Sequence, residues 1–166
     1  MLPQIEACIP ALRRYAAALL RSRQDADDLV HDCLVRALDK LHTRRDDGDI
    51  RAWLFAIMHN LFISQRRRSV VRPDSAPLGE QAEIFGVRAD QESSLLYREV
   101  VRELNGLPEE QRQVILLVSV EDLSYTEVAR VLGIPVGTVM SRLSRGRERL
   151  RRAAQEPVRS GLRRVK

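Results

Sequence analysis

Two short helical patterns separated by a glycine, within residues 123–152, restrict the fold of this chain more than any other stretch. Ser124 and Glu127 have the spacing of a capping box, in which each residue satisfies a free amide of the other at a helix start. Gly133 follows where a left-handed turn would end that helix, and a second helix is expected to begin near Pro135. Val128, Val131 and Leu132 are predicted to face inward. The pattern predicts a helix-turn-helix, whose second helix can enter a DNA major groove.

The second helix separates apolar from basic residues around its circumference. Its inward positions are predicted to be Val136, Val139, Leu143 and Leu150. Its outward positions are Thr138, Ser141, Arg142, Arg145 and Arg149. A basic outer face alone is equally consistent with an ordinary amphipathic helix in water. Because a capped helix and a tight turn precede it, the pattern favours DNA binding.

Charge is distributed unevenly along the 166 residues, whose net charge is +5. Residues 133–166 hold 10 basic and 2 acidic side chains, whereas residues 92–132 hold 4 basic and 8 acidic ones. A basic end of this kind indicates a nucleic acid partner. Enzyme chemistry is not expected. The three histidines and two cysteines lack metal-ligand spacing, no phosphate-binding loop or nucleophile elbow occurs, and the carboxylates are predicted to lie on solvated helix faces, so no metal, cofactor or small-molecule substrate is predicted.

Residues before position 70 form three predicted helices, at 4–21, 25–41 and 50–66. In the second helix the predicted buried stripe is Val30, Leu34, Leu38 and Leu41, beside Leu29, Cys33 and Ala37. The opposite face carries Asp25, Asp28, Asp32, Arg36 and Asp39. Such a face is usually only solvated, although its excess of acid also suits a basic partner.

The third predicted helix combines an apolar side with polar and basic residues. Its apolar side is predicted to be Ile50, Trp53, Leu54, Ile57 and Leu61. His59 and Asn60 interrupt that stretch, and Arg66, Arg67 and Arg68 end it. This composition suits single-stranded DNA, which binds proteins through base stacking and phosphate contacts. For Trp53 itself, a place in the core is the competing interpretation.

The remaining pattern predicts an all-α fold of two small helical domains. The domains are expected at residues 1–68 and 92–154, with a flexible linker at 69–91 and a basic, disordered tail at 155–166. The pattern also permits a short helical turn at 82–85, and the second domain begins with predicted helices at 92–105 and from Leu107-Pro108 onward. In the first of these, Leu95, Leu96, Val100, Val101 and Leu104 are predicted to face inward.

The two cysteines and the lengths of the apolar segments indicate in which cellular compartment the protein is expected. Cys8 and Cys33 are predicted to be buried, reduced thiols. We expect neither a signal peptide nor direct membrane insertion, because no apolar run has the required length. A cytoplasmic location is therefore expected.

Three stretches together resemble an extracytoplasmic-function sigma factor, the small two-domain class of bacterial transcription initiation factor. They are DADDLVHDCLVRAL, IRAWLFAIMHNLFISQRRR, and LPEEQRQVILLVSVEDLSYTEVARVLGIPVGTVMSRLSRGRERLR. The resemblance covers roughly residues 10–68 and 92–153. It implies core RNA polymerase and promoter DNA as partners, together with an anti-sigma factor that holds the free protein.

The resemblance also implies roles for individual residues. Core polymerase would bind Asp28, His31, Asp32 and Leu34, where His31 replaces the usual Gln. The −10 element would be read and opened by Trp53, His59, Asn60, Ser64, Arg66, Arg67 and Arg68, with Leu54 in place of a second aromatic residue. The −35 element would be contacted by Thr138, Met140, Ser141, Arg142, Arg145 and Arg149, with Met140 where Lys or Arg is common.

Two other functions are compatible with parts of the pattern. A stand-alone helix-turn-helix regulator would bind duplex DNA by itself, usually as a dimer on half-sites. A helical adaptor would bind proteins only. Replacing Arg142 and Arg145 by Ala would then cause no loss of DNA binding.

Overall fold

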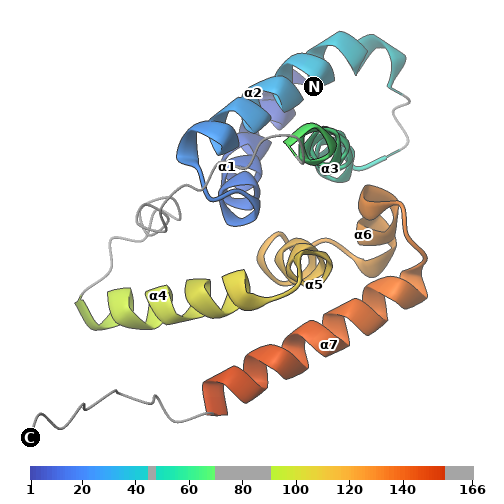
Figure 1. Cartoon of the computed structure of the whole chain (residues 1–166). Coiled ribbons are helices and arrows are strands. Elements are labelled where there is room, and N and C mark those ends of the chain that lie inside the picture. The colour runs from blue at the N-terminus through green and yellow to red at the C-terminus, as the bar shows by residue number, and fades with distance from the viewer. Residues whose placement is uncertain (45–47, 70–90, 156–166) are drawn as a thin grey trace, which may run out of the picture.

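The computed structural model describes residues 1–44, 48–69 and 91–155, all of them helical or in short connections (Figure 1). The first group of helices comprises α1 (Leu2–Leu19), α2 (Arg23–Lys40), the 3-10 turn η1 (Leu41–Thr43) and α3 (Ile50–Ser69). The second comprises α4 (Gln91–Gly106), α5 (Glu109–Ile115), the π-helical turn η3 (Leu116–Val120), α6 (Tyr125–Leu132) and α7 (Val136–Gln155). The predicted all-α class is confirmed. The predicted linker, its helical turn at 82–85 and the tail lie almost entirely outside the described residues.

Helices α1, α2 and α3 pack against one another around aromatic and aliphatic side chains. Tyr15 of α1 and Phe55 of α3 meet edge to face at 5.3 Å between ring centroids, a geometry that aromatic pairs favour. Helix α2 begins where Ser22 accepts a hydrogen bond from the Asp25 amide at 3.2 Å. An N-cap of this kind typically contributes about 1 kcal/mol. The three helices therefore share one core.

The buried face of α2 differs from the predicted one. Ala26, Leu29, Val30, Cys33 and Ala37 are buried, whereas Leu38 is 48% exposed. Small residues let α2 approach its neighbours closely, as the hydrogen bond from Cys33 Sγ to the Leu54 carbonyl illustrates. Spacing alone did not distinguish this face from the adjacent leucine stripe, which the structure leaves partly in solvent.

Other predicted inward positions also differ. In α3 the fully buried side chains include Phe55, Met58 and Phe62, which the predicted apolar side omitted. In the second group Val100 is 51% exposed and Val136 is 37% exposed. Both stand at helix positions that no neighbouring helix covers, whereas Val139 and Leu143 on the same side of α7 are buried as predicted.

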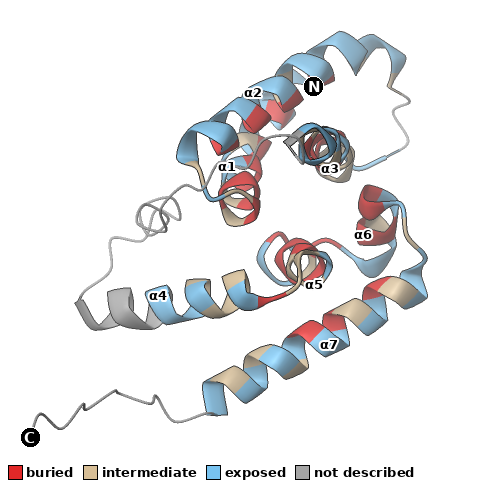
Figure 2. Cartoon of the chain, viewed as in Figure 1, coloured by how far each residue is buried: buried red, intermediate tan, exposed pale blue. Residues whose placement is uncertain are grey.

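The two groups pack against each other through α3, which lies beside α6 (Figure 1). Figure 2 shows buried residues on the sides of α1, α5 and α6 that face the middle of the molecule, and exposed residues along the outer sides of α2 and α7. No helix in the described part of the chain is long and apolar enough to cross a membrane.

Both cysteines are buried, as predicted. Burial raises the pKa of the Cys33 thiol to about 12 and also raises the pKa of the Cys8 thiol, because a thiolate is poorly solvated among apolar side chains. Both side chains are therefore protonated at neutral pH and act as small core residues.

Candidate functional site

The helix-turn-helix forms through the local contacts that the sequence predicts. Ser124 Oγ accepts a hydrogen bond from the Glu127 amide at 3.3 Å, and Glu127 Oε2 accepts one from the Ser124 amide at 2.8 Å. These hydrogen bonds to Ser124 lower the pKa of the Glu127 carboxyl group. Gly133 then adopts φ 64° and ψ 37°, the left-handed conformation that ends α6. The capping box thus fixes the start of α6, and the glycine ends it before the turn into α7.

Helix α7 is held against α5 by a close backbone approach. Gly146 is buried, and a Cβ atom at this position would lie 2.6 Å from Ile115 Cδ1. Val139 and Leu143 complete the buried side, so the basic residues face outward. Pro135 stands one residue before α7, and its carbonyl accepts hydrogen bonds from the amides of Thr138 and Val139.

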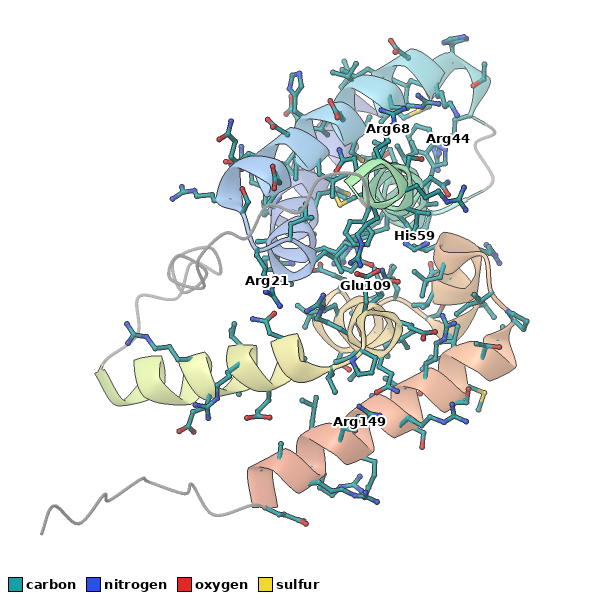
Figure 3. The ribbon with its side chains drawn as sticks, viewed as in Figure 1. Arg21, Arg44, His59, Arg68, Glu109 and Arg149 are labelled. Carbon is teal, nitrogen blue, oxygen red and sulfur yellow. The ribbon has the colours of Figure 1, made fainter. Side chains whose placement is uncertain are left out.

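The predicted −35 residues gather on the outer side of α7. Met140, Ser141, Arg145 and Arg149 are exposed, and Met140 reaches 53% (Figure 3 labels Arg149). Thr138 and Arg142 are half-buried. Arg142 Nη2 lies 2.5 Å from Glu110 Oε2 of α5, so a carboxylate holds this guanidinium beside the exposed face. Sequence reasoning missed Glu110, since nothing in the spacing relates α5 to α7.

The predicted polymerase-binding residues lie along the outer side of α2. Asp28, His31 and Asp32 are exposed, and Leu34 is half-buried. His31 and Leu34 border a groove between α1 and α2 that also includes Arg13. Two further apolar side chains, Val35 at 46% and Leu38 at 48% exposure, extend this face. The acidic face therefore includes Leu38, which the predicted stripe had assigned to the core, and Val35, which was not among the predicted buried residues.

The predicted −10 residues do not all share one surface of α3. Asn60, Ser64 and the arginines at 66–68 are exposed, and Ser64 donates a hydrogen bond to the Asn60 carbonyl at 2.8 Å. Trp53 is half-buried, and the Arg44 guanidinium lies 5.5 Å from its ring centroid. In this cation–π contact the guanidinium group of Arg44 lies over one face of the Trp53 ring.

His59 is the exception among the predicted −10 residues. It is only 8% exposed and lies on the side of α3 that faces the second group of helices (Figure 3). Its Nδ1 atom is buried without a hydrogen-bond partner, and burial lowers the pKa of the imidazole. In this arrangement His59 is neutral and inaccessible to DNA.

Glu121 is the main polar residue that sequence reasoning missed. Its side chain is 1% exposed, which corrects the prediction that the carboxylates lie on solvated helix faces. Glu121 Oε1 and Oε2 accept hydrogen bonds from Arg14 Nε at 3.2 Å and Nη2 at 2.9 Å, and Oε2 accepts a third from Arg51 Nη2 at 2.7 Å. Because 107 and 70 residues separate these partners, no local pattern could have indicated the cluster.

Comparison with known families finds two matches that follow one another along the chain. Residues 5–59 match the sigma2 domain of PhyR, and residues 97–150 match region 4 of the sigma-70 family. The first match contains the acidic face of α2 and the first half of α3. The second contains the helix-turn-helix.

Similar proteins span most of the chain. The ECF RNA polymerase sigma factor EcfG of Rhodopseudomonas palustris is 36% identical over 149 residues, which cover 88% of this chain and 80% of EcfG. Among solved structures, the sigma factor RpoE in complex with the anti-sigma factor NepR from Bartonella quintana has 30% identity and a TM-score of 0.77, over 93% of this chain and 96% of RpoE. CnrH in complex with the cytosolic domain of CnrY has 27% identity and a TM-score of 0.64, over 90% and 84% of the two chains.

Proposed function

The chain belongs to the extracytoplasmic-function sigma factors of bacterial RNA polymerase, and we propose that it reads promoters at two points, with α3 on the −10 element and α7 on the −35 element. In this role it gives core RNA polymerase its promoter specificity. The proposal divides the chain into an N-terminal domain (1–68), a linker (69–91), a C-terminal domain (92–154) and a basic tail (155–166). It acts in the cytoplasm, where promoter DNA and polymerase are present, and it is a transcription factor rather than an enzyme.

The observation that carries the proposal is the outward basic face of α7 behind a capped helix and a left-handed glycine. Arg145 and Arg149 are exposed, and the buried Gly146 between them fixes their direction. Met140 and Ser141 at the start of the same face suit contacts with base edges, where an apolar side chain can contact a thymine methyl group. Arg149 is better suited to a phosphate, which supplies affinity without sequence information.

The −10 element requires unpaired bases, and α3 offers groups that bind them. Asn60 and Ser64 supply exposed polar atoms, and Trp53 offers an aromatic ring for stacking, worth about 1–3 kcal/mol per base. Arg67 and Arg68 at the helix end suit strand phosphates. A single tryptophan, with Leu54 fully buried beside it, predicts weaker promoter melting than a pair of aromatic residues would give.

Core polymerase would dock on the outer face of α2. Asp28 and Asp32 provide negative charge, while Leu34, Val35 and Leu38 provide the apolar area that a stable interface needs. His31 stands among these residues and would share the interface. Charge complementarity would orient a basic polymerase surface, and apolar burial would supply most of the affinity.

An anti-sigma factor is the further partner that we propose. The structurally similar sigma factor RpoE was solved in complex with the anti-sigma factor NepR, and CnrH was solved in complex with the cytosolic domain of CnrY. Both align with more than four-fifths of this chain. The alignment with RpoE in its complex with NepR, at a TM-score of 0.77, includes both groups of helices of this chain.

The test compares promoter binding with and without core polymerase. Run-off transcription from a genomic library first identifies a promoter, and a gel shift then measures binding to that fragment. We expect tight, specific binding only when core enzyme is present. Strong specific binding by the protein alone would instead identify a stand-alone regulator, and no effect of replacing Arg142 and Arg145 together would identify a protein-binding adaptor.

A further inference from the structure

Arg142 differs from the other arginines on the outer side of α7. Arg145 and Arg149 are exposed and have no ion pair within the described part of the chain. The side chain of Arg142 is only 26% exposed, and its Nη2 atom lies 2.5 Å from Oε2 of Glu110 in the first turn of α5. A carboxylate therefore holds one arginine of the basic face and offsets its charge, whereas the other two have no such partner.

The pair depends on the close approach of α5 to α7, which lie side by side (Figure 1). Gly146 has no side chain, and a Cβ atom in its place would lie 2.6 Å from Ile115 Cδ1 and 3.4 Å from Gln111 Cβ. Glu110 is the neighbour of that glutamine, and Arg142 stands about one helical turn before the glycine. The glycine that brings the two helices together therefore also brings the Glu110 carboxylate within reach of Arg142.

This ion pair contributes little to the stability of the fold. Glu110 is 60% exposed, so water screens its charge, and both side chains lose rotamer freedom when they meet. The pair fixes instead the direction of the Arg142 guanidinium group, a planar donor at the end of a flexible side chain. The carboxylate also offsets the positive charge of that group.

Direction and charge matter differently for the two kinds of DNA contact. A phosphate attracts any nearby cation, and each such contact releases counterions and makes binding more dependent on salt. A base edge requires an arginine in one orientation, since guanine presents two acceptors, O6 and N7, in the major groove. A guanidinium group paired with a carboxylate gains less from a phosphate, because the carboxylate repels that phosphate, whereas its fixed direction suits a base edge.

We propose that Glu110 is a positioning residue of the −35 reader, which keeps Arg142 away from the phosphates and directs it at a guanine of the −35 element. The role rests on the proposed function, because it requires α7 in the major groove. It assigns a part in DNA reading to α5, a helix that supplies none of the predicted DNA-binding residues. Removing the carboxylate should therefore weaken sequence discrimination while it strengthens the dependence of binding on salt.

The experiment measures binding of the holoenzyme to a promoter fragment that run-off transcription has identified. The wild-type chain is compared with Glu110→Gln, Arg142→Gln, the double variant of both, and the control Glu148→Gln, each assembled with core polymerase. The control also removes a glutamate that pairs with arginines of α7, in this case Arg151 and Arg152. Each form is titrated against the fragment, against fragments with single substitutions in the −35 element, and at increasing salt concentration.

Glu110→Gln should reduce discrimination at one guanine of the −35 element by about 3- to 10-fold, a part of the roughly 5- to 150-fold that a well-placed arginine provides. Its plot of log K against log salt concentration should steepen by about 0.9, the value for one added phosphate contact. Arg142→Gln should lose at least as much discrimination at the same guanine without changing that slope. In the Arg142→Gln background, Glu110→Gln should change neither quantity, because Glu110 acts through that guanidinium group. Glu148→Gln should leave discrimination unchanged, and all variants should keep the wild-type circular dichroism spectrum.

Several results would contradict the role of Glu110. Unchanged discrimination or an unchanged salt slope with Glu110→Gln would overturn it, and so would an equal effect of that substitution in the Arg142→Gln background. Reduced discrimination with Glu148→Gln would mean that net charge, rather than the ion pair, governs base reading. If the wild-type protein showed no core-dependent binding, the proposed function would fail and this role with it, a result that the wild-type titration alone identifies.

Discussion

The contact between Gly146 and Ile115 allows a stability prediction that separates helix propensity from packing. Replacing Gly146 by Ala in the interior of α7 should gain about 1 kcal/mol of helix propensity. The new Cβ would lie 2.6 Å from Ile115 Cδ1, 3.3 Å from Ile115 Cγ1 and 3.4 Å from Gln111 Cβ. The first distance requires movement of the side chain or of α7. Overpacking of this kind costs about 1–3 kcal/mol, so Gly146→Ala should be net destabilising by about 1 kcal/mol.

Ile115→Val supplies the matched background, because valine lacks the Cδ1 atom that causes the clash. By itself, Ile115→Val should lower the free energy of unfolding by about 0.5–1.5 kcal/mol. In that background Gly146→Ala should be neutral or stabilising by up to about 1 kcal/mol, since propensity remains and the worst contact is gone. The double-mutant cycle should therefore give a coupling energy of about 1–2 kcal/mol.

Urea unfolding followed by circular dichroism measures the four free energies of unfolding. The slopes with urea must agree among the variants for the comparison to be valid. Distant, independent sites add within about 0.3–0.5 kcal/mol. Additivity within that margin, or a stabilising Gly146→Ala in the wild-type background, would refute the close approach of α7 to α5 and with it the orientation of the basic face.

The remaining predictions concern docking, base reading and pH. Asp28→Arg with Asp32→Arg should abolish binding to core polymerase in a pull-down, while the circular dichroism spectrum stays unchanged. Undiminished binding would contradict the proposal that α2 forms the interface. Arg145→Ala should reduce the binding free energy by about 1–3 kcal/mol on the preferred −35 sequence and by less on substituted sequences. Arg149→Ala should instead weaken binding to all sequences alike. Gel shifts with holoenzyme distinguish the two patterns. Burial lowers the pKa of His59, so the unfolded chain binds its proton first as pH falls through about 6.5. Stability should thus fall by up to about 1 kcal/mol between pH 6.5 and 5.5, and His59→Gln should lack that step; identical pH profiles would contradict the burial.

Local signals predicted the helix-turn-helix well. Ser124, Glu127 and Gly133 act on backbone groups within a few residues, so their spacing alone indicates the cap and the turn. Helix positions elsewhere followed from apolar periodicity, with ends displaced by at most three residues. For α2 the predicted start at residue 25 omitted Ser22, whose hydroxyl caps the helix that begins at Arg23.

The buried faces were less predictable, because a face is chosen by what packs against it. In α2 two adjacent stripes satisfy helical spacing, and the stripe with Ala26, Cys33 and Ala37 is buried because it admits close neighbours. Leu38 on the other stripe is the larger and more apolar side chain, yet it stays 48% exposed. Composition predicted that the leucine stripe would be buried. In the structure, α1 and α3 pack against the other stripe instead.

Glu121 shows why some buried charged residues cannot be predicted from sequence. An acidic residue near the end of a helix normally indicates a solvated position, and its partners lie in helices from the other end of the chain. A protein that only needed a stable domain could have placed an apolar residue there, since replacing a buried ion pair by apolar side chains often costs nothing. Charged groups behave differently from apolar ones when an interface must open, because water solvates them well in the separated state. The cluster of Glu121, Arg14 and Arg51 therefore holds the two groups of helices together through charged groups that water would solvate well if they separated.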